Sequence, residues 1–425
     1  MRITHLILTD FRSYEAVQVD FGPGVTTLVG RNGHGKTNVV EAVRYLSTLS
    51  SHRVATDAPM LRLGAQRAIV SGRVQRGDRS LTLEVTMVPG KANQARLNRG
   101  NAKPRDLVGI LRTVVFAPED LALVKGDPGT RRAFMDELCV ALQPPLAGDL
   151  TDYDRVLRQR SSLLKSARGK PRFDVSTLDV WDEKLAHLGA RITHARLAAM
   201  EALAPHVDQA YADVAPGEGT CSIAYSTAVE VALDDVDAEE AGGIKPTAAP
   251  TAVTPVADIG EALHSRMVER RSQEIERGVC LVGPHRDDLE IRIRELPAKG
   301  YASHGESWSC ALALRLGSFA LLSDDGDDGE PVLILDDVFA ELDSGRRAAL
   351  AGRVVGAGQV LITAAVTEDV PERLREHPDG HRILYVTPGL VSDMADSAVT
   401  GDSAVTGDQA VTGDQAATSD PGADT

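Results

Sequence analysis

The first 116 residues alternate between short apolar runs and turn residues, a pattern typical of β-strands. Apolar positions recur in 2-RITHLILTDF-11, 15-EAVQVDF-21 and 25-VTTLVG-30, with a Gly-Pro-Gly turn before the third run. Directly after Thr37 the apolar spacing becomes that of a helix, and strand-like patterns return over residues 67–116. We therefore predict an N-terminal β layer that is interrupted by one helix.

A second region, residues 130–215, is rich in Leu and Ala at helical spacing and has few turn residues. It predicts a helical lobe inserted into the first fold. Residues 233–260 combine acidic residues with Ala, Pro, Thr and Gly, a composition that does not build a core, so we predict a flexible insertion there. A helix is expected again over residues 260–277.

The last third of the chain predicts a strand-like piece over 279–294, a helix over 306–322 and a buried strand in 331-PVLILDD-337. From Asp396 a six-residue repeat (DSAVTG, DSAVTG, DQAVTG, DQAATS) predicts a disordered acidic tail. The expected divisions are 1–125 (first part of lobe I), 126–300 (helical lobe II), 301–390 (end of the core) and 391–425 (tail).

The formal net charge of −15 argues at first against nucleic-acid binding, which depends on Lys and Arg. The acidic residues are concentrated, however, in residues 231–240, 323–330 and 391–425, which contain five, five and seven of them and no Lys or Arg. The rest of the chain has a formal charge of +2. It therefore has room for a basic face.

Four cysteines lie far apart and form no C-x-x-C pair, so neither a zinc site nor a disulfide framework is indicated. The first 15 residues become polar too early for a signal peptide, and no run of 18 uncharged apolar residues occurs. We expect a protein of the reduced cytoplasm without a membrane partner.

The stretch 30-GRNGHGKT-37 fits the phosphate-loop pattern G-x-x-x-x-G-K-[ST] and lies between a predicted strand and a predicted helix. In such loops backbone N–H groups surround the phosphates, the Lys reaches the β- and γ-phosphates, and the Thr hydroxyl binds Mg²⁺. A glycine turn with a chance Lys-Thr pair is the alternative. The predicted ATP-binding residues are Gly30, Arg31, Asn32, Gly33, His34, Gly35, Lys36 and Thr37.

The predicted strand in 331-PVLILDDVFAELD-343 ends in two carboxylates. Four consecutive apolar residues are typical of a parallel strand covered on both faces, and ligands gather at the carboxyl ends of such strands. We expect Asp336 to hold the Mg²⁺ shell together with Thr37, and Asp337 to orient or polarise the attacking water, with Lys36 as the third catalytic residue. An Asp pair that only caps the next turn is the alternative.

The turn 303-SHGE-306 leads into the predicted helix 306–322. By itself it is a capping box, with Ser at the N-cap and Glu three residues later. The same helix start presents unpaired N–H groups, a small Gly and a Ser hydroxyl, which suit an anion. Its order and distance relative to the phosphate loop and the Asp pair favour the anion site.

That order resembles the head of ATP-binding-cassette (ABC) ATPases, with 303-SHGE-306 as the signature, PVLILDD as Walker B and 340-AELD-343 as the D-loop. The resemblance implies an α/β P-loop NTPase head in which the signature of one subunit covers the γ-phosphate held by the other. Two ATP molecules would lie between the two copies of a homodimer. The residues assigned to the nucleotide site on this ground are Ser303, Gly305, Glu306, Asp343 and Arg12.

Longer stretches are similar to the RecF family, which is related to SMC heads. They are 6-LILTDFRSYE-15, 30-GRNGHGKTNVVEAVRYLS-47, 116-FAPEDLALVKGDPGTRRAFMD-136, 151-TDYDRVLRQRSSLL-164, 283-GPHRDDLEI-291, SHGE and ILDDVFAELD. About 265 residues separate Thr37 from Ser303, and they include a β sublobe, so no long coiled coil fits. The expected fold is an ABC-type head with an N-terminal β layer and an inserted helical lobe.

The RecF resemblance implies an ATP-dependent clamp on gapped or duplex-junction DNA that helps RecR and RecO to place RecA on single strands, with weak, DNA-stimulated ATP hydrolysis. Two basic clusters agree with DNA binding, although solvated helix faces also look like this. One is Arg96, Arg99, Lys103, Arg105 and Arg112, and the other is Arg155, Arg158, Arg160, Lys165, Arg168, Lys170 and Arg172.

Three positions depart from the ABC pattern. Asp337 stands where many such ATPases have Glu, Thr363 stands where transporters have His, and Glu119 is the substitute for a Q-loop Gln. These differences suit an ATP-timed clamp better than a fast motor. Two other classes stay open: an ABC subunit of a membrane transporter and an SMC-type chromosome-structural ATPase.

His285 and Arg286, within 283-GPHRDD-288, are compatible with two roles. One is packing or ion pairing with Asp287 and Asp288, and the other is ligand binding.

Overall fold

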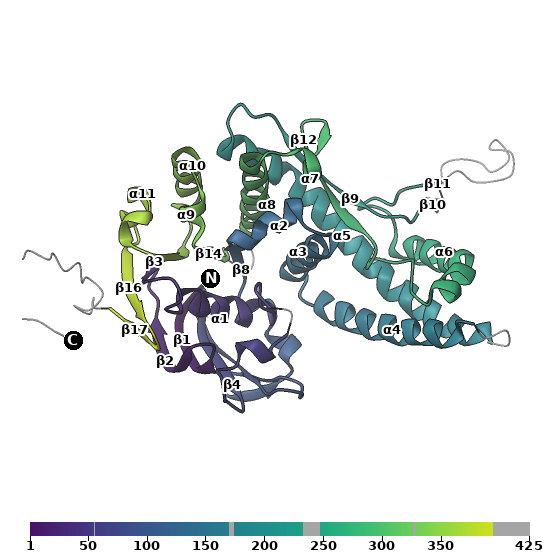
Figure 1. Cartoon of the computed structure of the whole chain (residues 1–425), viewed down its shortest axis with the longest axis horizontal. Coiled ribbons are helices and arrows are strands. Elements are labelled where there is room, and N and C mark those ends of the chain that lie inside the picture. The colour runs from purple at the N-terminus through teal and green to yellow at the C-terminus, as the bar shows by residue number, and fades with distance from the viewer. Residues whose placement is uncertain (55, 170–173, 233–246, 326–328, 394–425) are drawn as a thin grey trace, which may run out of the picture.

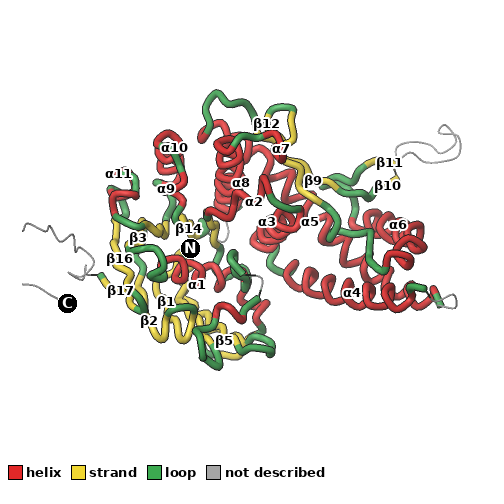
Figure 2. The backbone as a smooth tube through the Cα atoms, in the orientation of Figure 1, coloured by secondary structure: helices red, strands yellow, loops and turns green. Residues whose placement is uncertain are grey.

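Two six-stranded sheets and a group of long helices form the two lobes of the molecule (Figure 1). The computed structural model describes residues 1–393 except 55, 170–173, 233–246 and 326–328. Lobe I holds both large sheets, and lobe II is mostly helical with a small sheet of order β13-β12-β9 (Figure 2). The predicted repeat tail beyond residue 393 and the first half of the predicted insertion lie outside the described residues.

The first sheet is antiparallel, in the order β2-β1-β4-β5-β6-β7. Its strands are β1 (Arg2–Phe11), β2 (Tyr14–Asp20), β4 (Ala68–Arg76), β5 (Arg79–Met87), β6 (Gln94–Leu97) and β7 (Gly100–Ala102). In β1 the buried residues Ile3 and Leu6 are three apart because the pairing with β4 is irregular between Ile3 and His5. The predicted N-terminal β layer is present, and β6 and β7 are additional.

The second sheet has the order β17-β16-β3-β15-β14-β8 and is parallel except for β17. Its strands are β3 (Gly24–Val29), β8 (Thr113–Phe116), β14 (Val332–Asp336), β15 (Gln359–Ala364), β16 (His381–Thr387) and β17 (Leu390–Ser392). Every residue of β3, β14 and β15 is buried, because the first sheet and helices cover the two faces of the second sheet. The carboxyl ends of these three strands meet at one edge.

Lobe II is organised around α5 (Asp179–Val214), against which α4, α6 and α8 pack. Gly317 of α8 permits this packing, because a Cβ there would lie 3.0 Å from the backbone nitrogen of Val207. The remaining helices are α1 (Lys36–Thr48), α2 (Leu121–Lys125), α3 (Pro128–Leu142), α4 (Leu146–Ala167), α6 (Val256–Arg277), α7 (Ala298–Tyr301), α8 (His304–Asp324), α9 (Val338–Glu341), α10 (Ser344–Val354) and α11 (Glu372–Arg375).

Some predicted boundaries are wrong. The strand expected over 279–294 is limited to β12 (Asp288–Ile293), since Gly283 has φ of 126° and begins a turn. The flexible insertion does not reach residue 260, because β11 (Thr247–Ala248) pairs with β10 (Val231–Ala232) and α6 begins at Val256. The segment assigned to the tail begins inside β17.

Candidate nucleotide-binding site

The loop between β3 and α1 needs glycine at both of its ends. A Cβ at Gly30 would lie 2.3 Å from the carbonyl oxygen of Val386. Gly35 has φ of 109°, and a Cβ there would lie 2.8 Å from the hydroxyl of Tyr14, which donates to the Gly35 carbonyl at 3.1 Å. Val386 of β16, in the second sheet, and Tyr14 of the first sheet thus exclude side chains at Gly30 and Gly35.

Lys36 folds back over this loop. Its ammonium donates to the carbonyl of Gly30 at 2.8 Å and to Oδ1 of Asn32 at 3.2 Å, and the residue is buried. Arg31, Asn32 and Gly33 are exposed at the rim, whereas His34 contacts the Val386 carbonyl at 3.2 Å. The Lys36 charge is therefore held where phosphates would enter between the rim and the helix N-terminus.

Asp336 is the centre of a buried hydroxyl-carboxylate cluster at the edge of the sheet. Its Oδ1 accepts hydrogen bonds from Thr37 at 3.0 Å and from Thr363 at 2.7 Å. These three residues come from α1, β14 and β15, so the parallel pairing of the strands brings together positions up to 326 residues apart. Thr363 was expected in the switch region, and its contact with Asp336 was not predicted.

Asp337 lies outside the buried strand and has φ of 52°, in the left-handed region. The Thr363 hydroxyl accepts from its backbone N–H at 2.9 Å, which fixes the turn. Burial raises the pKa of Asp337 above its ordinary value; the Lys36 ammonium opposes this rise and the Asp336 carboxylate adds to it. A carboxylate with a raised pKa beside a Lys is suited to interact with a water molecule.

The residues at this edge fit a magnesium ion. Thr37 Oγ1 and the Asp336 carboxylate are hard oxygen ligands on adjacent elements, and Mg²⁺ is held by one or two such groups together with phosphates and waters. Among the described residues no group of three or more His, Cys, Asp and Glu side chains forms a self-sufficient metal site. The nucleotide would therefore have to supply part of the coordination.

The signature turn forms a complete capping box at the start of α8. Ser303 Oγ accepts from the Glu306 N–H at 3.2 Å, and Glu306 Oε2 accepts from the Ser303 N–H at 2.9 Å. The backbone hydrogen bond from Ser303 lowers the pKa of Glu306, and Arg294 adds to this. Ser303 and His304 are exposed, so the helix N-terminus faces solvent while it is capped.

Arg346 of α10, which no sequence motif singled out, joins the signature to the D-loop. Its guanidinium donates to Ser309 Oγ at 2.8 Å and is paired with Asp343 and Glu218. Asp343 caps α10 by accepting from the Arg346 N–H at 2.9 Å, and a Cβ at Gly305 would lie 3.0 Å from the guanidinium. The signature turn and the D-loop thus form one continuous surface, which the Arg346 side chain holds together.

The predicted site residues therefore form two groups. Gly30 to Thr37, Asp336 and Asp337 meet at the sheet edge, and Ser303 to Glu306 meet Asp343 at the ends of α8 and α10. No hydrogen bond or ion pair between the described residues joins one group to the other. Arg12 belongs to neither, because its guanidinium is held by the buried Glu41 and by the Pro59 carbonyl at 2.8 Å.

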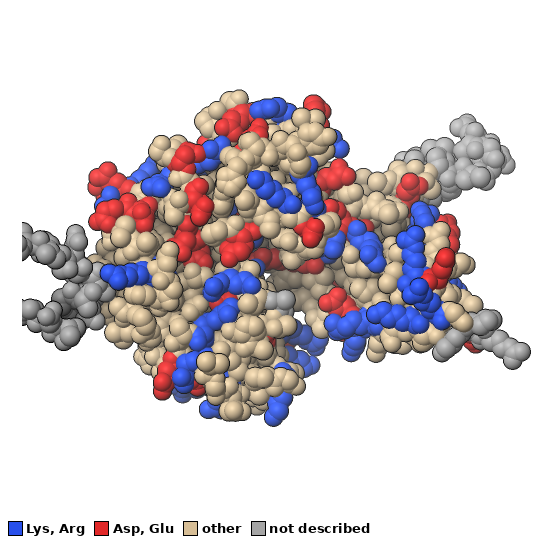
Figure 3. Space-filling view, viewed as in Figure 1, with Lys and Arg blue, Asp and Glu red and all other residues tan. Residues whose placement is uncertain are grey.

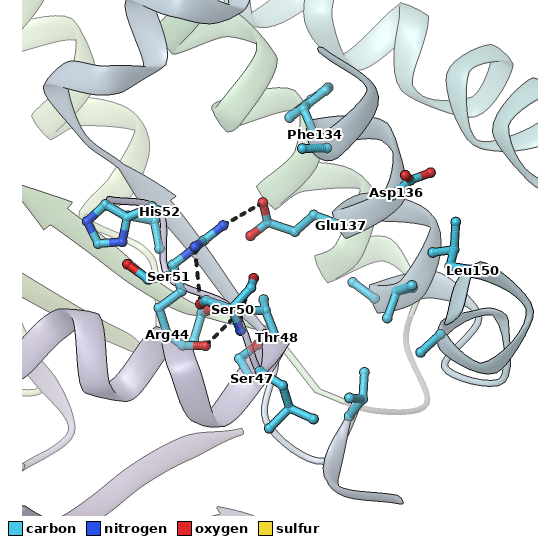
Figure 4. Close-up of a pocket in the computed structure, with 18 of the residues that line it drawn as sticks. Arg44, Ser47, Thr48, Ser50, Ser51, His52, Phe134, Asp136, Glu137 and Leu150 are labelled. Atoms are coloured by element: carbon cyan, nitrogen blue, oxygen red, sulfur yellow. Dashed lines mark hydrogen bonds and ion pairs between the residues drawn. The ribbon is translucent and has the colours of Figure 1, made fainter. Parts of the chain in front are cut away.

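A chain of buried ion pairs connects the phosphate-loop helix to the signature helix. Arg44 of α1 pairs with Glu137 of α3 at 3.0 Å, Glu137 lies 3.6 Å from Arg315 of α8, and Arg315 pairs with Asp120 at 2.7 Å. Glu119, the proposed Q-loop substitute, is exposed beside them. These side chains line a cavity of about 1160 Å³ between the lobes (Figure 4).

Part of each predicted basic cluster is not available to DNA. Arg112 is buried and pairs with Asp325, and Arg160 is buried between Asp182 and Glu274. Arg158, Lys165 and Arg168 are exposed along α4, whereas Lys170 and Arg172 lie outside the described residues. In Figure 3, Lys and Arg gather along the lower edge of lobe II, over α4.

Among the described residues, no helix combines the length and the apolar character that crossing a membrane requires.

Known proteins are similar to this chain over most of its length. Residues 2–376 match the family model of the RecF/RecN/SMC N-terminal domain. The chain is 53% identical over 398 residues to DNA replication and repair protein RecF of Kineococcus radiotolerans, covering 92% of this chain and 98% of that protein. It is 54% identical over 380 residues to the protein of the same name from Frankia alni, covering 88% and 96%.

Solved structures give the same result. The recombination mediator protein RecF-ATPrS in the RecFOR pathway is similar with a TM-score of 0.78 and 26% identity, covering 93% of this chain and 98% of that one. An SMC head bound to the C-winged helix domain of ScpA is similar in fold, with a TM-score of 0.50 and 15% identity over 92% and 96%. The predicted ABC-type head without a long coiled coil is confirmed.

Proposed function

This chain belongs to the RecF/RecN/SMC N-terminal domain family, and we propose that it is an ATPase of recombinational DNA repair and replication that binds DNA under the control of ATP. The proposal rests on the phosphate loop, with Lys36 over the phosphate position, and on the names of the relatives. Mg²⁺ would be held by Thr37 and Asp336, and Asp337 would orient the attacking water.

ATP would close a homodimer. The observation that carries this proposal is the separation of the two groups of site residues within one chain. Ser303, His304 and Asp343 are exposed, and the signature group has no hydrogen bond or ion pair to the phosphate-loop group among the described residues. A second copy would bring its Ser303, Gly305 and Glu306 to the γ-phosphate and so complete each site. A site completed only in the dimer couples nucleotide occupancy to association.

In this proposal the closed dimer binds gapped and double-stranded DNA, works with RecR, and through RecO and RecR serves the placement of RecA on single strands in the cytoplasm. Asp337 is shorter than the Glu of many ABC ATPases, which supports slow hydrolysis, and we expect DNA to stimulate this hydrolysis. The exposed basic residues of α4 support contacts directed at phosphates rather than at base edges.

Two variants test the shared site. Lys36→Arg keeps a positive charge and should retain ATP binding while hydrolysis falls by at least tenfold, since the guanidinium does not fit the place of the ammonium. Ser303→Arg should bind ATP normally but stay monomeric with ATP in analytical ultracentrifugation. Ser162→Arg, on the exposed face of α4, is the matched control. ATP-dependent dimerisation of Ser303→Arg at the wild-type level would contradict the shared site.

A further inference from the structure

We propose that His52 is a positioning residue of the nucleotide site, which together with Asp336 holds a water molecule of the Mg²⁺ shell. This inference rests on the proposed ATPase function and deepens it. Thr37 and the phosphates would bind the ion directly, whereas Asp336, the second residue that holds the Mg²⁺ shell, and His52 would act through the water. The residue lies in 49-LSSHRV-54, the loop that follows α1, which no motif assigned to the site.

The imidazole of His52 is buried without a partner. Its side chain is 8% exposed, and neither Nδ1 nor Nε2 has a hydrogen-bond partner in the protein. Buried polar side chains are satisfied in nearly all native proteins, by protein groups or by ordered water, so two unpaired ring nitrogens at one position indicate a missing polar partner.

The position of the ring identifies that partner. His52 Nε2 lies 3.7 Å from Asp336 Oδ2, beyond hydrogen-bond distance. Both ring nitrogens are closed off from solvent, so a water that contacts both atoms would enter as the ring and the carboxylate separate slightly. The other carboxylate oxygen, Oδ1, is already occupied by Thr37 and Thr363. Oδ2 and Nε2 therefore face the same space, beside the hydroxyl that would ligate Mg²⁺. In Figure 4 the ring points away from Glu137.

The loop that carries His52 is held in place from below. Leu49 ends α1 with φ of 54°, and Ser51 Oγ accepts from the N–H groups of Arg53 and Val54 at 3.0 and 3.2 Å. The Ser51 hydroxyl in turn donates to Glu41, the buried carboxylate that also holds Arg12. Arg12 thus contributes to the site indirectly, because it fixes the group that fixes this loop.

A hydrogen bond from a metal-bound water to His52 would strengthen metal binding. Outer partners of metal ligands typically contribute 10- to 100-fold to metal affinity. A neutral imidazole nitrogen accepts a hydrogen from such a water, as the Asp336 carboxylate does. His52 would then supply a contact with the Mg²⁺ shell from the loop after α1. Glu119, the proposed Q-loop substitute, is exposed.

The test measures binding rather than turnover. A fluorescent ATP analogue is titrated against wild type, His52→Leu, His52→Gln and the control His206→Leu, in EDTA and over a series of Mg²⁺ concentrations. We expect equal affinities in EDTA, and a Mg²⁺ midpoint for His52→Leu that is about tenfold or more above wild type. His52→Gln, whose amide oxygen also accepts a hydrogen, should recover part of this loss.

A wild-type Mg²⁺ midpoint for His52→Leu would overturn the inference, and so would equal shifts in the Leu and Gln variants, because these would mean that the ring only fills space. Thermal unfolding of each variant identifies a general loss of structure, and the Gln variant then decides. If wild type itself bound no ATP analogue under either condition, the proposed function would fail as well, so the two failures are distinguishable.

Discussion

His285, in the motif 283-GPHRDD-288, lies between α4 and the backbone of Cys280. Tyr153 donates to its Nδ1 at 2.7 Å, and its Nε2 donates to the Cys280 carbonyl at 3.3 Å. Burial lowers the pKa of His285 to about 4; the bond to Cys280 opposes this shift and Arg286 adds to it. Both ring nitrogens are occupied inside the protein, so the packing role applies and the ligand role does not.

This environment predicts a pH dependence of stability. An unfolded His titrates near pH 6.5, so between pH 6.5 and 4 the unfolded chain binds more protons than the folded one, and the free energy of unfolding falls as the pH falls. From pH 7 to pH 5 we expect this residue to remove about 1 to 2 kcal/mol. Urea unfolding at both pH values, with His285→Gln beside wild type, measures it.

The Gln variant should lose less stability than wild type over this range. Asp136 and Asp287, whose pKa values burial raises, contribute with the opposite sign, but they are present in both proteins and cancel in the difference. His206→Gln, on the surface of α5, serves as control. An equal pH dependence of wild type and His285→Gln would contradict a buried neutral ring.

Single residues were predictable where a local pattern names them. Lys36 and Thr37 follow from the loop motif, and Asp336 follows from the buried strand before it. His52 and Arg346 were not predictable, because their significance depends on partners that the fold brings from distant segments. For Arg112 and Arg160 the local pattern was misleading. Clusters of basic residues predicted that both side chains are exposed, but both are buried and paired with carboxylates from distant segments.

Helix α3 connects α1 to α8 through the side chain of Glu137. This carboxylate lies between Arg44 of α1 and Arg315 of α8. Burial alone would raise its pKa, but the guanidiniums of Arg44 and Arg315 hold the pKa of Glu137 below its ordinary value. The helix after the phosphate loop and the helix after the signature are therefore joined through one side chain.

Glu137→Gln should be destabilising by about 2 to 4 kcal/mol, because the buried Arg44 loses its carboxylate partner while Arg315 keeps only Asp120. Denaturant unfolding measures the loss. Glu290→Gln, on the exposed side of β12, should change stability by less than about 0.5 kcal/mol and is the control. A Glu137→Gln protein as stable as its control would mean that the ion pairs of Glu137 with Arg44 and Arg315 do not stabilise the fold.

Whole elements were predicted best where burial is uniform. The apolar run of β14 predicted a buried parallel strand directly, and the helical spacing over 130–215 predicted a helical lobe, which contains α3, α4 and α5. Boundaries were less predictable where a turn is set by tertiary contacts. Residues 279–287 read as a strand, but Pro284 and His285 pack against α5 and α4 and turn the chain.

At the scale of the molecule, the exposed basic residues of α4 and the buried ones beside them give a matched test of DNA binding. Arg158 is exposed and Arg160, two residues later, is buried between two carboxylates. Arg158→Ala should leave the unfolding temperature unchanged, weaken DNA binding, and reduce the slope of log affinity against log salt by about one. Fluorescence anisotropy with gapped duplex and ATP measures both quantities.

Arg160→Ala should behave differently, with a loss of about 3 to 5 kcal/mol in stability, because Glu274 is left buried without its counter-charge and Asp182 keeps only Arg271. Binding that is insensitive to the Arg158 change would place the DNA surface away from α4. Binding by wild type that is insensitive to salt would contradict contacts directed at phosphates.

Strand β3 lies between β15 and β16, so it cannot pair with either neighbour until late in the synthesis of the chain. About 330 residues separate the end of β3 from the start of β15, so a ribosome adding about 5 to 20 residues per second needs roughly 15 to 70 s to supply the missing neighbour. During synthesis the completed β layer waits beside an apolar strand with two open edges. Nascent chains of this protein are therefore expected to need chaperone protection until β15 and β16 have emerged.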